Sequence, residues 1–100
     1  MKVFQGDARA WLALEELCGL IAAPPEWVAE RVQAGFVDVE LGTPAQGLQG
    51  WRFDSLVVAR LRSMRRTELC FGAEPELAAL VADLEEEVAR LRARLYAIDR

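Results

Sequence analysis

Apolar residues in the first third of the chain follow a helical period in two short runs. In the first run they recur at i, i+3, i+4 and i+7, as Leu14, Leu17, Cys18 and Ile21. This spacing predicts a helix over residues 13–22 with one apolar face.

The second run predicts a helix that begins at the pair Pro24-Pro25 and ends before Gly35. Proline suits a first helical turn because the N–H group that it lacks would be unpaired there. Glycine suits the position after a helix because it adopts the left-handed conformation at little cost. Val28 and Val32 would form the buried pair between these limits. Two short helices joined by a tight break predict a helix-turn-helix unit.

The stretch after this unit predicts a small wing. Residues 36–41 alternate apolar and polar side chains, as a half-buried strand does. Trp51–Phe53 predicts a second short strand, and the glycine-rich loop at 42–50 would join the two strands as a hairpin. Asp54 is a suitable N-cap for a third helix over residues 55–69.

The C-terminal quarter carries a heptad pattern. Apolar residues alternate at spacings of four and three, at Leu77, Val81, Leu84, Val88, Leu91, Leu95 and Ile98. This pattern predicts a coiled-coil helix that begins at Pro75. Such a helix is over about 30 Å long, and a domain of this size cannot cover it. We therefore expect these seven residues to hold two copies together, with a winged helix-turn-helix domain over 1–70 and a dimerising helix over 71–100.

Charge is distributed unevenly along the chain. The net charge is −4 and the isoelectric point is 4.8, which argues against a uniformly basic, nucleic-acid-binding surface. Residues 12–50 contain six carboxylates and Arg31 as their only cation, whereas residues 52–66 contain five arginines and Asp54 as their only anion. An acidic first half beside a basic third helix predicts a charge-complementary partner or self-association.

Residue types that carry catalysis are scarce. The chain has no histidine to act as a base near neutral pH. Cys18 and Cys70 fit no metal-binding spacing and are expected to be buried free thiols. We therefore expect a non-enzymatic protein without metal or cofactor. Residues 2–5 are compatible with a short edge strand, and neither a signal peptide nor a membrane span is visible, so a cytoplasmic protein is expected.

Two sets of residues are candidates for contacts with a partner. A protein partner would meet the first two helices at Glu15, Glu16, Glu26, Trp27 and Glu30. Trp27 is expected to be partly exposed, because it stands beside charged residues, and an exposed tryptophan is a good anchor for a protein partner. DNA would instead meet the arginines of the second and third helices and of the wing, Arg31, Arg52, Arg62, Arg65 and Arg66.

Four segments together resemble a known family. They are LALEELC at 12–18, GFV at 35–37, WRFD at 51–54 and RTEL at 66–69, followed by the leucine heptads. Their order and spacing resemble the MerR-like winged helix-turn-helix fold and, within it, the chaperone modulator family CbpM. The family usually places Gly-Val/Ile-Ser/Thr in the first turn, where this chain has Ala22–Pro24.

The resemblance implies a specific function. CbpM proteins are small, dimer-forming adaptors that bind the J-domain of the DnaJ-like co-chaperone CbpA and inhibit its action with the Hsp70 chaperone. The Hsp70-facing helix of a J-domain is basic, so an acidic surface on the first two helices would be attracted to it. The alternative is a dimeric MerR-family transcriptional regulator that binds DNA. Members that bind DNA carry an arginine-aromatic run in the second helix, where this chain has Glu26, Glu30 and a single Arg31.

Overall fold

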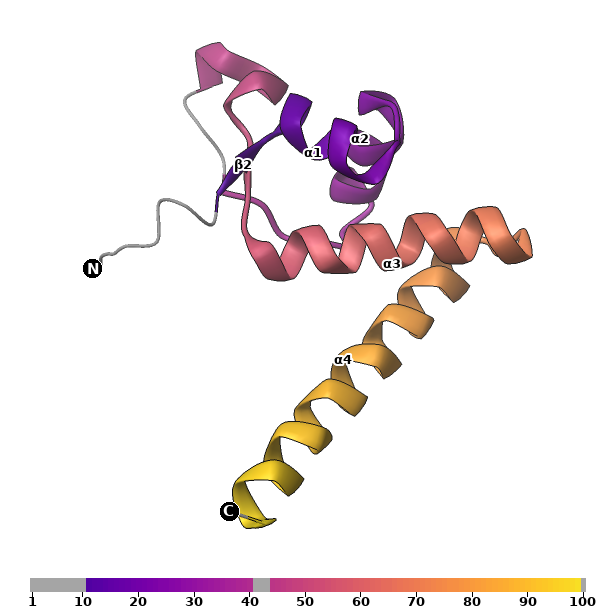
Figure 1. The fold of residues 1–100 in the computed structure, drawn as a ribbon. Coiled ribbons are helices and arrows are strands. Elements are labelled where there is room, and N and C mark those ends of the chain that lie inside the picture. The colour runs from indigo at the N-terminus through magenta and orange to yellow at the C-terminus, as the bar shows by residue number, and fades with distance from the viewer. Residues whose placement is uncertain (1–10, 41–43, 100) are drawn as a thin grey trace. The chain divides into compact units, whose positions relative to one another are not determined.

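A computed structural model describes residues 11–40 and 44–99 of the chain (Figure 1). The predicted strand at residues 2–5 lies outside this part. The described residues form four α-helices, a short 3-10 helix and one two-stranded antiparallel sheet, so the prediction of a mainly α fold is confirmed. The chain divides into two compact units, an N-terminal unit of residues 1–62 and a C-terminal unit of residues 63–100. None of the helices in the described part combines the length and apolarity that crossing a lipid bilayer requires.

The first helix, α1, spans Leu14–Ile21, close to the predicted limits. The carboxylate of Glu16 accepts a hydrogen bond of 2.9 Å from the N–H group of Ala13, which satisfies a donor ahead of the first turn. At the other end the N–H group of Ala23 donates to the carbonyl of Cys18 at 3.1 Å, across the left-handed Ala22 with φ 56°. Alanine has a steric cost in this conformation, which glycine would avoid.

The second helix, α2, spans Pro25–Gln33 and confirms both predicted limits. Its end is a Schellman motif around Gly35, which has φ 87°. The N–H group of Gly35 donates to Val32, and the N–H group of Phe36 donates to Arg31, both at 3.0 Å.

The sheet differs from the predicted wing. Strand β2, Leu12–Ala13, pairs with strand β3, Arg52–Phe53. Of the segment predicted as a strand at 36–41, residues 36–40 are described, and they meet β3 in one isolated antiparallel bridge between Glu40 and Arg52. The backbone of Phe36 explains why no ladder begins at the start of this segment. Its N–H group is used by the Schellman motif and its carbonyl accepts a 2.7 Å hydrogen bond from Nε of Arg60, so neither can join a strand ladder.

The segment before β3 is more regular than the predicted flexible loop. Residues Pro44–Gly50 form 3-10 turns, labelled η2, with a kink at Gly47 where φ is 57°. The N–H group of Trp51 closes the last turn on the carbonyl of Leu48 at 3.2 Å. Residues 44–50 of the predicted loop are therefore regular 3-10 structure, whereas residues 41–43 lie outside the described part and the hairpin wing stays a prediction.

Aromatic and aliphatic side chains build the core of the N-terminal unit. The buried residues include Leu14, Leu17, Ile21, Val28, Val37, Trp51, Phe53, Val58 and Leu61. The rings of Trp51 and Phe53 meet edge to face, with centroids 6.3 Å apart. Leu14, Leu17 and Ile21 come from the apolar face that the helical period predicted.

Helix α3 spans Ser55–Phe71 and passes from one unit into the other. Its start confirms the predicted cap, because Oδ1 of Asp54 accepts a 2.9 Å hydrogen bond from the N–H group of Val57. A turn at Gly72, with φ 65°, leads into α4, which runs uninterrupted over Pro75–Asp99 (Figure 1). The predicted helix at the heptad pattern is thus formed as a single long helix.

Candidate protein-interaction surfaces

Two helices of the N-terminal unit carry exposed carboxylates. Glu15 and Glu16 lie in the first turn of α1, and Glu26 and Glu30 lie on α2. We call these four residues the acidic face. Acidic groups in a first helical turn also interact favourably with the helix dipole, which supports Glu15, Glu16 and Glu26 where they stand.

The environment of Cys18 on α1 includes one acidic residue of α2. Burial raises the pKa of the Cys18 thiol, and the nearby carboxylate of Glu26 raises that pKa further. Glu26 therefore lies close to α1. Glu15 precedes Cys18 by three residues and so shares its side of α1. Glu26 of α2 is thus near enough to α1 to act on the thiol of Cys18.

Trp27 does not have the partly exposed position that the sequence suggested. Its side chain belongs to the buried set, with 8% of the residue exposed. The guanidinium of Arg31 lies over its ring, 4.4 Å from the centroid. Arg31 also forms an ion pair of 2.9 Å with Glu30. The expectation of an exposed tryptophan anchor is therefore wrong, because an arginine one helical turn away covers the ring.

The arginines considered for DNA are partly used within the chain. Arg31 is 8% exposed, and Nη1 of Arg52 donates to the carbonyls of Gln49 and Trp51 at 3.1 and 2.9 Å. Arg66 pairs with Glu85 at 3.2 Å. Arg62 is exposed and Arg65 is half-buried.

The heptad residues of α4 form an open apolar stripe along one side of the helix, which we call the leucine seam. Val81 is half-buried, and the others are 44% to 76% exposed. The members of the seam are Leu77, Val81, Leu84, Val88, Leu91, Leu95 and Ile98. Apolar groups repeating along one side of a helix are a ready surface for a second helix.

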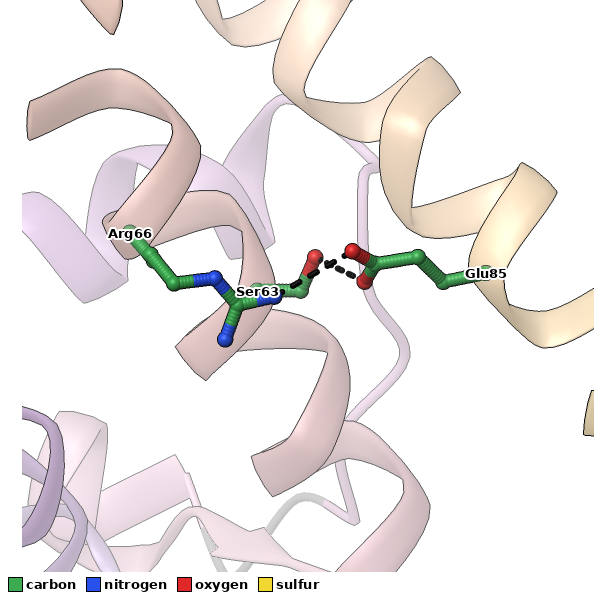
Figure 2. A network of polar contacts seen from close by, with 3 residues as sticks. All are labelled: Ser63, Arg66 and Glu85. Atoms are coloured by element: carbon green, nitrogen blue, oxygen red, sulfur yellow. Dashed lines mark hydrogen bonds and ion pairs between the residues drawn. The ribbon is translucent and has the colours of Figure 1, made fainter. Parts of the chain in front are cut away.

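A different side of α4 consists of small residues and is buried. Ala78, Ala79 and Ala82 are buried, and Glu85 continues the same side one turn later. Figure 2 shows Ser63 and Arg66 of α3 directed toward the carboxylate of Glu85. The hydroxyl of Ser63 donates to Oε1 at 2.5 Å, and Nη2 of Arg66 lies 3.2 Å from Oε2.

Sequence reasoning missed this alanine side. A signal was present, because Ala78, Ala79 and Ala82 recur at helical spacing beside the larger heptad residues. Small residues allow close approach of a neighbouring backbone, and Ser63, also buried, has a short side chain on α3. The two sides of α4 are therefore chemically distinct, with alanines enclosed and leucines open.

The described residues contain no group of three or more His, Cys, Asp or Glu side chains placed to hold a metal ion. Comparison of the chain with protein-family models, with curated proteins and with solved structures finds no match.

Proposed function

We propose that the chain is a non-enzymatic modulator that binds the J-domain of a DnaJ/CbpA-like co-chaperone and inhibits its action with Hsp70. The observation that carries the proposal is the acidic face, whose four carboxylates on α1 and α2 are all exposed. Arg31, the only cation within these helices, lies over Trp27 and against Glu30. A basic helix of a J-domain would complement this surface.

The left-handed turn between α1 and α2 gives the resemblance to CbpM further support. The family usually has glycine where this chain has Ala22, and Ala22 adopts a backbone conformation that glycine favours. The position therefore keeps the geometry that the family's glycine suits. We also propose that α4 joins two copies through the leucine seam, as the heptad pattern predicts.

The DNA-binding alternative has weaker support. It depends on arginines that reach phosphate groups, and Arg31, Arg52 and Arg66 make contacts within the chain. The acidic face would also be repelled by phosphate. Specific DNA binding that falls steeply as salt rises, measured by mobility shift, would favour this alternative over the proposal.

A double charge reversal on the acidic face tests the proposal. Glu15→Lys with Glu26→Lys is suitable, because neither side chain has a hydrogen bond or ion pair among the described residues, whereas Glu16 caps α1 and Glu30 holds Arg31. We expect binding of a purified J-domain to weaken about tenfold or more at low salt, because several exposed charge pairs of up to ~1 kcal/mol each reverse sign. Titration by calorimetry measures the dissociation constant.

The matched control is Glu74→Lys with Glu76→Lys, which changes the net charge by the same amount at the start of α4. We expect it to bind the J-domain like the unaltered protein. Stimulation of Hsp70 ATPase by the co-chaperone is the functional readout, and the unaltered protein should suppress it. Unaltered protein that shows no binding at tens of micromolar at low salt would exclude the proposal, as would equal binding by both double variants.

A further inference from the structure

The exposed side of α1 changes in chemistry from one helical turn to the next. Glu15 and Glu16 lie in the first turn, and Gly19 and Leu20 follow them on the same side, each four residues later. All four residues are exposed, and Leu20 is 51% exposed. A pair of carboxylates therefore lies one turn before a position without a side chain and an apolar side chain. We call these four residues the α1 face.

The packing of this chain does not require glycine at position 19. The backbone of Gly19 is helical, so no left-handed conformation favours glycine there. A Cβ atom added to Gly19 would meet no atom of the surrounding structure within 4 Å. Glycine inside a helix is also less favourable than alanine, because it loses more conformational freedom on folding. The missing side chain therefore contributes nothing to the fold, and it leaves the backbone of α1 open to close approach from outside.

Leu20 places an apolar group beside this open backbone. The apolar residues that follow the helical period, Leu14, Leu17 and Ile21, are buried on a different side of α1. Leu20 is thus not part of that core. An apolar group with charged groups beside it is typical of contacts between proteins, in which an apolar centre has a polar rim.

We propose that the α1 face binds a basic amphipathic helix that crosses α1 at Gly19. An apolar side chain of that helix packs on Leu20, and its lysines or arginines lie against Glu15 and Glu16. The distance between two packed helices depends on the side chains at their contact, so a glycine there permits a close crossing. This inference rests on the proposed function for the identity of the partner, and it adds the place of the contact and its apolar part.

Charge complementarity selects this kind of partner. An acidic segment would be repelled by Glu15 and Glu16, and a wholly polar segment would leave Leu20 without an apolar contact. Complementary charges mainly raise the rate of association and fix the orientation of the partner. The contacts at Gly19 and Leu20 would instead slow its release, which is where most differences in affinity arise.

Gly19→Gln and Leu20→Gln test the two parts of this contact. Gly19→Gln fills the open position and should weaken binding of a purified J-domain about tenfold. It should also raise the denaturation midpoint, because glutamine is a better helix former than glycine, so the loss of binding would not reflect unfolding. Leu20→Gln should weaken binding about tenfold through the loss of apolar burial. Calorimetric titration gives the dissociation constants.

Ala59→Gln and Leu56→Gln are matched controls, because they make similar changes at exposed positions of α3. We expect both to bind the J-domain like the unaltered protein. The losses in Gly19→Gln and Leu20→Gln should persist as salt rises, because steric and apolar effects are not screened. The loss in the double charge reversal on the acidic face should shrink. Equal losses in the α3 controls, or losses at the α1 face that disappear with salt, would overturn the inference.

A synthetic leucine–lysine peptide that forms a basic amphipathic helix tests the α1 face without any co-chaperone. We expect amide NMR shifts of Gly19 and Leu20 to change on its addition, and both variants to bind it about fivefold more weakly. Shift changes confined to α4, or peptide binding that neither variant weakens, would overturn the inference.

The two proposals can therefore fail separately. Peptide binding at the α1 face by a protein that does not bind the J-domain would exclude the proposed function alone. J-domain binding that neither Gly19→Gln nor Leu20→Gln weakens would overturn the role of the α1 face and leave the proposed function in place.

Discussion

In the N-terminal unit Leu17, Val28 and Phe53 are fully enclosed, whereas in the C-terminal unit the enclosed residues of α4 are alanines and its leucines stay exposed. Large apolar side chains gain the most free energy from burial, and the N-terminal unit obtains that gain within the chain. The C-terminal unit leaves that gain unrealised in a single chain. The difference teaches that stability in the first unit is internal, while the proposed pairing of α4 with a second copy would tie its stability to protein concentration.

The largest expected effect is the difference between two phenylalanines, one buried in the N-terminal unit and one exposed in the C-terminal unit. Phe53→Ala should cost about 3–5 kcal/mol of unfolding free energy, because it removes a fully buried ring and leaves a cavity beside Trp51. Phe71→Ala should change it by less than about 0.5 kcal/mol, because Phe71 is 81% exposed. Denaturant unfolding followed by tryptophan fluorescence gives both values. Similar losses for the two variants would break the comparison.

The next effect concerns the alanine side of α4. Ala82→Leu should cost about 1–3 kcal/mol, because Ala82 is 1% exposed and a larger side chain would overpack its surroundings. Ala89→Leu is the control, because Ala89 is exposed and lies off the seam. Thermal unfolding measured at several protein concentrations separates this loss from any change in self-association. A neutral Ala82→Leu variant would show that the alanine side tolerates bulk.

A smaller effect, of opposite sign, is expected between α1 and α2. Ala22→Gly should stabilise the protein by about 0.5–1 kcal/mol. The steric strain that it removes from the left-handed backbone exceeds the conformational entropy that glycine loses on folding. Ala34→Gly should instead destabilise it by about 0.5–1 kcal/mol, since Ala34 has a right-handed backbone with φ −78°. Denaturation midpoints of the two variants should therefore move in opposite directions.

The most local effect is the titration of one thiol. Because its pKa is raised, Cys18 has less thiolate at pH 8 than an ordinary cysteine, and should react with a maleimide more slowly than the exposed Cys70. Glu26→Gln removes one cause of the raised pKa and should speed the labelling of Cys18 without affecting Cys70. Mass spectrometry of partly labelled protein measures both rates. An unchanged labelling rate at Cys18 would show that the carboxylate of Glu26 does not act on this thiol.

Local backbone chemistry could be read from the sequence with good accuracy. The proline pair at 24–25 and Gly35 limit α2, Asp54 caps α3, and α4 starts at Glu74-Pro75, as predicted. Each of these effects acts within one helical turn, so a residue and its near neighbours decide the outcome.

Pairing and burial could not be read in this way. Strand β3 pairs with Leu12–Ala13, about forty residues earlier in the chain, and no local pattern in the sequence indicates that pairing. Trp27 is covered by Arg31. The charged neighbours of Trp27 in the sequence had predicted exposure instead. Of the proposed surfaces, the acidic residues could be predicted as exposed, but the approach of Glu26 to Cys18 required the fold.

The contacts of Glu85 restrict the rotation of α4 about its own axis. Successive residues of an α-helix are rotated by about 100° around its axis, so a slip of one residue would swing every side chain to a new direction. A carboxylate held at both oxygens, by Ser63 and by Arg66, opposes that slip (Figure 2). These two contacts fix the rotation of α4 about its own axis. They therefore keep the leucines of the seam exposed within a single chain.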